Sequence, residues 1–355
     1  MYTSDTDRVN KVEDKKVIWF NHWFTAITNT IKDVKKTFGN SIVVIASNKN
    51  DRCAYKNYAD KFFVEDGSLS AEEYVEWALG VCADNKVDLF IPKRCMLEIA
   101  KNMPRFEAIG TKVMCDDATT ISLFDSKSEV YTGLAKSSYT SIPWFKVVKS
   151  IDDFILGYRE VVESGNVACI KYDADEGASS FRVISDNWMN IDSLKQPLMN
   201  LITYNDMLSI LSDGLHKNRL KPMILMHKLD NPEVSVDCYN SSQFGFVALP
   251  RFKMGNRVKE IRLNNSIIFD AKKLQDVYGF KSVWNAQYRW QKDGSLKLLE
   301  INPRMSGGIH LSSAIGFSLP IQCIAEKLGI ESNNPMTNKL HDHVVTQCET
   351  PIVLE

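Results

Sequence analysis

Short apolar runs alternate with segments of helical periodicity over the first 110 residues. Runs rich in β-branched residues predict strands, and apolar residues spaced three and four apart predict helices. This alternation is typical of a parallel sheet covered by helices. The predicted strands are 17–20, 41–46, 62–65, 87–91 and 112–114, and the predicted helices are 26–38, 71–81 and 95–101.

The pattern changes after this region. Residues 116–150 indicate a helical link, and a helix at 152–164 follows it. The next two apolar runs flank a turn of small and acidic residues, which predicts a hairpin. The remaining predicted elements are strands at 167–172, 181–184, 222–226, 233–237, 244–253 and 282–290, with a helix at 206–215.

The stretch from Leu298 to Gly308 carries the strongest chemical signal. Side chains alternate along a strand, so Glu300 and Asn302 project from one face as a ligand pair for a hard cation. Pro303 ends the strand, Arg304 adds a fixed positive charge, and the turn of small residues after it lets backbone approach a ligand. Glu300 alone could equally be a structural acid, but the whole string favours a magnesium-nucleotide site.

Two other stretches fit a nucleotide. Lys171 near the end of an apolar strand needs an anion if it is buried, although a solvent-facing lysine is the alternative. The turn after it, at 175–180, can cover phosphates with its N–H groups. An adenine could lie on the apolar strand before His227, with backbone of Met226 to Lys228 at its edge and Glu233 accepting from ribose.

Composition narrows the class of protein. With 43 basic and 44 acidic residues among 355, the net charge of −1 gives no footprint for nucleic acid or an anionic membrane surface. The eight cysteines form no C-x-x-C pair, and neither a signal region nor a spanning apolar segment is present. We therefore expect a cytoplasmic protein with reduced thiols. His341, Asp342 and His343 could bind a metal, but a solvated tail is the preferred interpretation.

The N-terminal sheet holds weaker candidates. Asn21, His22 and Trp23 follow the first strand in place of a G-x-G-x-x-G fingerprint, so a dinucleotide is not indicated. His22 and Trp23 could line a substrate pocket, although a turn and a core aromatic are the favoured interpretation. Arg94, just past a strand's carboxyl end, is a better substrate candidate.

Taken together, the order of these motifs resembles the ATP-grasp superfamily, in particular the domain type of the carbamoyl-phosphate synthetase large chain and biotin carboxylase, over roughly residues 15–329. The resemblance implies a mixed α/β and α+β chain: an N-terminal parallel-sheet (pre-ATP-grasp) domain, then a two-subdomain fold that clasps ATP between antiparallel sheets. The implied domains are 1–115, the N-terminal α/β domain; 116–150, a helical linker; 151–228, the small subdomain; 229–330, the large subdomain; and 331–355, a tail.

The family's functional positions transfer to this sequence one by one. The resemblance implies ATP and Mg²⁺, with Mn²⁺ as an alternative. Arg251, like Arg304 and Lys171, is implied to be catalytic. The phosphate-binding and closing-loop positions fall on Lys127, Lys171, Ser179 and Ser180; the adenine and ribose positions on Met226, His227, Lys228 and Glu233; and the metal ligands on Gln287, Glu300 and Asn302. The closing loop of relatives is richer in glycine, and here only Gly177 is present.

The implied activity is that of a carboxylate–amine ligase that forms an amide through an acyl phosphate and releases ADP and phosphate. Its partners would be a small-molecule carboxylate and an amine, and relatives are often homodimers. Three alternatives stay open. They are a phosphotransferase acting on hydroxyls, a bicarbonate-dependent carboxylase, although no biotinyl lysine motif accompanies the chain, and a nucleotide-binding regulatory protein without turnover.

Overall fold

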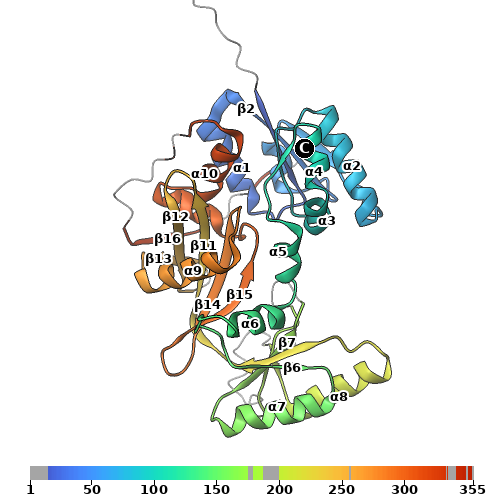
Figure 1. Ribbon diagram of the computed structural model, residues 1–355, viewed down its shortest axis with the longest axis vertical. Helices are drawn as coiled ribbons and strands as arrows, with labels where there is room; N and C mark the ends of the chain where they lie inside the picture. Colours follow the sequence, from blue (N-terminus) through green and yellow to red (C-terminus); the bar gives the residue numbers. More distant parts are fainter. Residues whose placement is uncertain are drawn as a thin grey trace, which may run out of the picture. The chain divides into compact units, whose positions relative to one another are not determined.

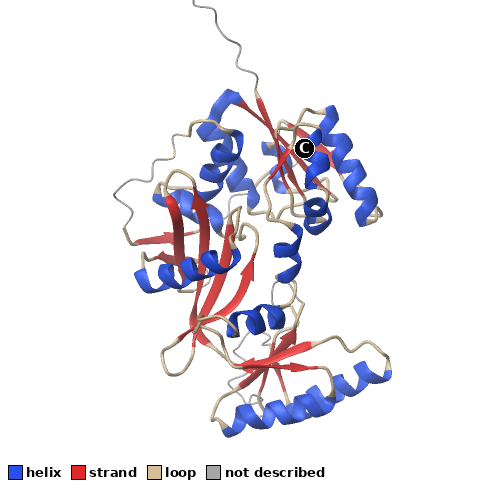
Figure 2. Ribbon diagram, in the orientation of Figure 1, coloured by secondary structure: helices blue, strands red, loops and turns tan. Residues whose placement is uncertain are grey.

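The computed structural model describes residues 15–174, 179–186, 200–255, 257–332, 334, 341–348 and 351–353 (Figures 1 and 2). The chain divides into two compact units. The first comprises Met1–Cys115, Gly307–Asn338 and Thr350–Glu355, and the second comprises Asp116–Ser306 and Lys339–Glu349. None of the helices in the described ranges is long and apolar enough to cross a bilayer.

The first unit is built on the predicted parallel sheet, whose strand order is β3-β2-β1-β4-β5. Helix α1 shows why the pattern folds this way, because its buried residues Ile27, Ile31, Val34 and Phe38 recur at helical spacing. Helix α4, with Pro104 in its first turn, was not predicted. The bounds are Lys16–Asn21 (β1), Ile27–Phe38 (α1), Ile42–Asn48 (β2), Lys61–Val64 (β3), Ala71–Asp84 (α2), Leu89–Ile91 (β4), Met96–Lys101 (α3), Met103–Ala108 (α4) and Lys112–Val113 (β5).

A second stretch of chain completes this unit. Helix α10 (Leu319–Leu328) contacts α1 and β4, and seven of its residues are buried. A helix that is apolar on nearly all sides must be covered on all sides, which explains its place within the unit. The compact unit that holds the N-terminal sheet includes Gly307–Asn338.

The second unit contains two sheets. The smaller sheet has the order β6-β10-β7-β8-β9. Helices α7 and α8 contribute Phe154, Val161, Met207 and Leu211 to a core shared with its strands. These elements are Phe145–Val148 (β6), Ile151–Glu163 (α7), Ala168–Tyr172 (β7), Arg182–Ile184 (β8), Leu201–Ile202 (β9), Tyr204–His216 (α8) and Met223–His227 (β10), and helices α5 (Ala118–Leu123) and α6 (Lys127–Ala135) precede them.

The larger sheet is antiparallel, with the order β15-β14-β11-β12-β13-β16. Its last strand, β16, belongs to the segment interpreted as a solvated tail: Val344 and its neighbours pair with β13, and Asp342 Oδ1 accepts from the Leu263 N–H at 2.9 Å. No group of three His, Cys, Asp or Glu side chains in the described ranges is arranged to hold a metal. The elements are Asp230–Ser241 (β11), Gly245–Lys253 (β12), Val258–Ile261 (β13), Asn265–Tyr278 (α9), Trp284–Trp290 (β14), Leu296–Asn302 (β15) and His343–Thr346 (β16).

Strand alternation gives the larger sheet two unlike faces. Val234, Val236 and Cys238 of β11 are fully buried in the core that also holds Ile267 and Leu274 of α9. The intervening residues carry polar side chains on the opposite face, as the alternation of a strand requires. They are Glu233, Ser235 and Asp237 on β11, Arg251 and Lys253 on β12, Asn285, Gln287 and Arg289 on β14, and Glu300 and Asn302 on β15.

Candidate functional site

A pocket of about 320 Å³ lies within the second unit, between its two sheets. Both sheets and the start of α6 contribute to its walls, so residues far apart in sequence meet in one place. It is lined by Lys127, Cys169, Lys171, Phe181, Met226, His227, Leu229, Glu233, Lys253, Gln287, Arg289, Leu299 and Glu300. Seven of these are predicted site residues: Lys127, Lys171, Met226, His227, Glu233, Gln287 and Glu300.

The acid-and-amide cluster forms at the hairpin of β14 and β15. Gln287 pairs directly with Glu300 across the two strands, and the hairpin turns at Gly294. The Asn302 Nδ2 donates to Glu300 Oε1 at 3.2 Å, so these two side chains share a face. A register shift after Gln287 leaves Leu299 as an extra residue, and Leu299 also lines the pocket. Three oxygen-bearing side chains therefore gather at the end of the hairpin.

Two buried lysines line the same pocket as this cluster. Lys127 is 8% exposed and Lys171 is 6% exposed. The Lys127 Nζ lies 3.9 Å from Glu300 Oε2 and 3.5 Å from the Asp173 carbonyl oxygen. Two buried lysines in one pocket, with one carboxylate near Lys127, give the pocket a positive charge suited to phosphate groups.

Asp173 holds the start of α6 and thereby places Lys127. It follows β7, and its carboxylate accepts from Ser126 Oγ at 2.7 Å, from the Ser128 N–H at 2.7 Å and from Ser128 Oγ at 2.8 Å. Because Lys171 lies two residues earlier on β7, the same carboxylate ties the two lysines to one rigid framework. Carboxylates are favourable at a helix N-terminus, where N–H groups lack partners within the helix.

Glu233 lies between two basic side chains. Lys253 Nζ binds Glu233 Oε1, and Arg289 Nη2 binds Glu233 Oε2 at 2.9 Å. Burial by itself raises the pKa of the Glu233 carboxyl, but the charges and hydrogen bonds of Lys253 and Arg289 outweigh it and hold that pKa below its usual value. Glu233 is therefore ionised at neutral pH, as an acceptor for hydroxyl groups should be.

The predicted adenine segment is the end of β10 and the residues after it. His227 stacks on Trp144 at 5.0 Å between ring centroids, and burial lowers the pKa of its imidazole, with a further contribution from Lys292. The Lys228 N–H donates to the Val167 carbonyl at 2.7 Å, so this donor is already engaged. Met226 and His227 line the pocket, whereas Lys228 is not in the lining set.

Several predicted residues are not brought to the pocket. Asn302 and Arg304 lie outside its lining, and Arg304 Nη1 donates to the Met305 carbonyl at 3.2 Å. Ser180 Oγ accepts from the Tyr172 N–H at 2.8 Å, and the Ser179 carbonyl accepts from Arg182 at 3.3 Å. The other closing-loop residues, Gly177 and Ala178, lie outside the described ranges.

Arg251 differs most from its expected role. It is 3% exposed, and its Nε donates to Asp237 Oδ2 at 2.9 Å while its Nη2 donates to Ser306 Oγ at 2.9 Å. Asp237 is fully buried and also accepts from Asn285 Nδ2 at 2.9 Å. The structure thus places Arg251 in a buried ion pair that ties β11 to the chain after Arg304, instead of among the pocket residues.

We expect Asp237→Asn to lower the free energy of unfolding by about 3–5 kcal/mol, because it leaves the buried Arg251 charge without its counterion. The matched control is Asp276→Asn, which breaks the exposed pair with Lys272 on α9 and should cost no more than about 1 kcal/mol. Urea unfolding followed by tryptophan fluorescence measures both. Equal losses in the two variants would show that the buried pair is not a structural anchor.

Sequence reasoning missed three charged residues at the site. Lys253 and Arg289 line the pocket, and Asp173 positions Lys127. A signal for the first two was present, since Lys253 is two residues from Arg251 and Arg289 is two residues from Gln287, and such pairs share a strand face. The contact of Asp173 with Ser126 and Ser128 spans more than 40 positions in the sequence, so no local pattern predicts it.

Solved structures share this arrangement of sheets. The biotin carboxylase domain dimer of Hydrogenobacter thermophilus 2-oxoglutarate carboxylase, in complex with MgADP, ADP and bicarbonate, matches 89% of this chain and 70% of its own at 14% identity and a TM-score of 0.64. For Staphylococcus aureus N5-carboxyaminoimidazole synthetase with ADP, the match covers 92% of this chain and 80% of that chain, at 13% identity and a TM-score of 0.63. For Campylobacter jejuni biotin carboxylase with a β,γ-ATP ligand, it covers 89% of this chain and 71% of that chain, at 16% identity and a TM-score of 0.61.

The sequence carries a family signal as well. Residues 219–351 match the family described as ATP-grasp in the biosynthetic pathway with Ter operon. The chain has the ATP-grasp fold. The matched ATP-grasp segment contains the whole larger sheet, with Glu233, Gln287 and Glu300 on its polar face. A comparison with curated protein sequences found no significant match.

Proposed function

We propose that this ATP-grasp protein is an ATP-dependent carboxylate–amine ligase. The observation that carries the proposal is the pocket whose lining brings Lys127 and Lys171 together with Gln287 and Glu300. Two buried cations opposite an acid-and-amide cluster suit a metal-bound polyphosphate better than a neutral ligand. The solved structures with the same fold support it, since they hold ADP, MgADP or a β,γ-ATP ligand.

The metal ligands would be Gln287, Glu300 and Asn302. Their fit rests on the cross-strand pairing of Gln287 with Glu300 and on the 3.2 Å contact of Asn302 with Glu300, which gather oxygen donors of the kind Mg²⁺ prefers. When bound there, Mg²⁺ supplies neutralisation of charge on the phosphate oxygens. Glu300 lies 3.9 Å from the Lys127 Nζ, so cation and lysine would share one anionic ligand.

The reaction assigns the other residues their roles. An oxygen of the substrate carboxylate attacks the γ-phosphorus of ATP, the bond to the bridging oxygen breaks, and ADP leaves with its electron pair. An amine then attacks the acyl carbon, phosphate departs, and the amine's proton passes to solvent. Lys127 and Lys171 stabilise the phosphoryl charge, and Glu233, held ionised by Lys253 and Arg289, accepts from the ribose hydroxyls.

Bicarbonate is a second candidate for the carboxylate. The 2-oxoglutarate carboxylase domain with the same fold was solved with bicarbonate as well as MgADP. Bicarbonate attacks the γ-phosphorus in the same way and gives carboxyphosphate, so the pocket residues keep their roles. The two candidates differ in the product, which is a carbamate or another carboxylated acceptor in place of an amide.

The test is ADP release from MgATP with pools of amino acids, small carboxylates and bicarbonate, each with and without a pool of amines. We expect release that depends on one acid, with an amide or carboxylated product identified by mass spectrometry. A stable phosphate ester would identify a phosphotransferase. Tight ATP binding without release in any pool would contradict the ligase and favour a regulatory nucleotide-binding protein.

A further inference from the structure

The N-terminal unit has a polar cluster that the proposed ligase pocket does not use. Its sheet order, β3-β2-β1-β4-β5, means that the chain runs outward from β1 to β3 and then returns to β4 on the other side of β1. In open α/β sheets, ligands bind outside the carboxyl ends of the strands at such a reversal point. His22 directly follows β1, and Arg94 lies three residues after β4, so the two loops at this point carry both side chains.

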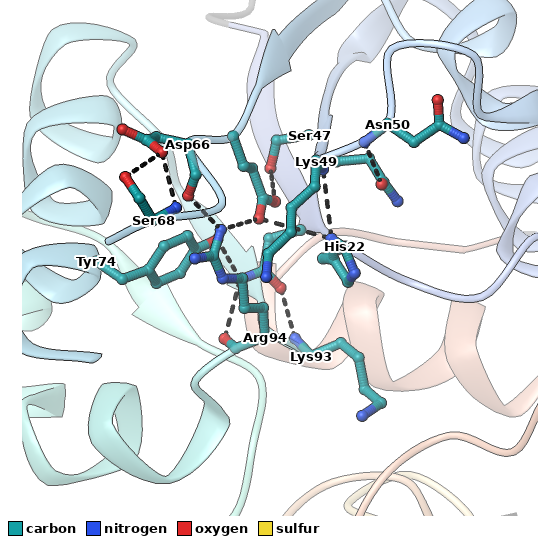
Figure 3. Close-up of polar contacts among 12 residues, drawn as sticks. His22, Ser47, Lys49, Asn50, Asp66, Ser68, Tyr74, Lys93 and Arg94 are labelled. Carbon is teal, nitrogen blue, oxygen red and sulfur yellow. Dashed lines mark hydrogen bonds and ion pairs between the residues drawn. The ribbon is translucent and has the colours of Figure 1, made fainter. Parts of the chain in front are cut away.

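A buried ion pair occupies the centre of the cluster (Figure 3). Arg94 Nη1 donates to Glu65 Oε2 at 3.0 Å, with side-chain exposures of 9% and 0%. Glu65 Oε1 accepts from Ser47 Oγ at 2.8 Å, and Arg94 stacks on the Tyr74 ring at 4.3 Å. Glu65 follows β3 and Ser47 is the second-last residue of β2, so the carboxyl ends of four strands converge here. Removing both charges of such a pair from water costs free energy. A buried pair of this kind is nevertheless expected where a binding site must be held rigid.

The two loops at the reversal point are held in unusual conformations. His22 has φ +42° and Cys95 has φ +52°, a region that residues other than glycine seldom adopt. The fully buried Asn21 joins the loops, because its Nδ2 donates to the Arg94 carbonyl at 3.2 Å and its Oδ1 accepts from the Lys93 N–H. Backbone strain of this kind concentrates at ligand sites.

Positive charge exceeds negative charge around His22. Lys49, Lys93 and Arg94 each act on its imidazole, against the buried Glu65; Asp66 at the rim is tied to Ser68 at 2.6 Å. Burial lowers the pKa of His22, Glu65 opposes this, and the three cations lower it further. His22 is therefore neutral at pH 7 and able to donate or accept a hydrogen bond, while its side chain is 37% exposed.

We infer that the carboxyl edge of the N-terminal sheet is a binding site for the anionic end, carboxylate or phosphate, of a small molecule, formed by His22, Lys49, Lys93 and the Arg94–Glu65 pair. Charge-assisted hydrogen bonds from lysine and arginine recognise such groups. The site goes beyond the proposed ligase reaction and requires neither nucleotide nor magnesium, so its test and the test of the ligase can fail independently.

The experiment follows the His22 imidazole signal by NMR in the full chain without nucleotide. Inorganic phosphate and succinate are titrated separately at fixed pH and ionic strength, and His22→Gln identifies the signal among the six histidines. We expect a saturable shift with at least one anion. Saturation with phosphate alone assigns a phosphorylated ligand, and saturation with succinate alone assigns a carboxylate.

The decisive variant is Lys49→Gln with Lys93→Gln, which spares the buried Arg94–Glu65 pair. We expect this double variant to weaken anion binding by about tenfold or more. The matched control, Lys61→Gln with Lys112→Gln, makes the same charge change at the first residues of β3 and β5, the opposite edge of the sheet, and should leave binding within about twofold. No saturable His22 shift with either anion, or equal weakening in both double variants, overturns the proposal.

Discussion

Glu300→Gln is expected to reduce magnesium-dependent ADP release by at least about 100-fold, because it removes the only charge among the three proposed metal ligands. The amide keeps the size of the side chain, and Glu300 is 21% exposed, so the hairpin of β14 and β15 should fold as before. The loss should appear mainly as a higher magnesium requirement. ATP binding measured by calorimetry with Mg²⁺ and with EDTA gives the same comparison without a substrate.

The control for this variant is Glu260→Gln on β13 of the same sheet, where the carboxylate pairs with Arg262. It makes the same chemical change outside the pocket and should keep ADP release within about twofold of the unchanged protein. If Glu300→Gln retained full activity with an unchanged magnesium requirement, Glu300 would not be a metal ligand, and the acid-and-amide cluster would be structural.

The sequence predicted most of the fold because strands and helices leave local periodic patterns. The parallel sheet of the first unit was found in this way. Strand β16 and helix α10 show the limit. Val344 to Thr346 pairs with a strand more than 80 positions away, and α10 packs against α1 nearly 300 positions before it. Such partners are chosen by tertiary packing, which leaves no periodic signal in a single sequence.

The candidate site was predictable to the extent that it follows strand alternation. Glu300 and Asn302 were placed on one face correctly. Strand alternation does not tell which residues of one face line the pocket. Arg251 and Lys253 are two positions apart on β12, yet Lys253 lines the pocket and Arg251 pairs with buried Asp237. The choice depends on which partner lies across the sheet, and only the register of β11 against β12 decides that.

These contacts also explain how a sheet of fixed geometry can support a charged pocket. Lys253 and Arg289 both pair with the Glu233 carboxylate, and Arg251 pairs with Asp237. Lys127, at the helix start that Asp173 holds, lies near Glu300. Each of these four cations has a nearby anion, which offsets the cost of removing it from water. A phosphate entering beside Lys127 would therefore compete with Glu300 for that lysine, and a metal bound to Glu300 would relieve the competition.

Lys171→Met is expected to lower kcat/KM for ATP by about 100-fold to 1,000-fold at any magnesium concentration. Two unit charges roughly 4 Å apart interact by about 4 kcal/mol at an effective dielectric constant near 20, and methionine fills the same space without charge. Lys171 is 6% exposed, so its interaction with a phosphate is weakly screened by solvent. Steady-state ADP release over a range of ATP and magnesium concentrations measures the effect.

The matched control is Lys146→Met, which changes a lysine of β6 in the same sheet that pairs with Glu160 at 2.5 Å. It should alter kcat/KM by less than about twofold. The two pocket variants are distinguished by magnesium: added Mg²⁺ should partly restore the activity of Glu300→Gln and should not restore that of Lys171→Met. If added magnesium restored the activity of Lys171→Met, or if this variant were fully active without added magnesium, Lys171 would not contact the nucleotide. Its burial would then serve only the packing of the smaller sheet.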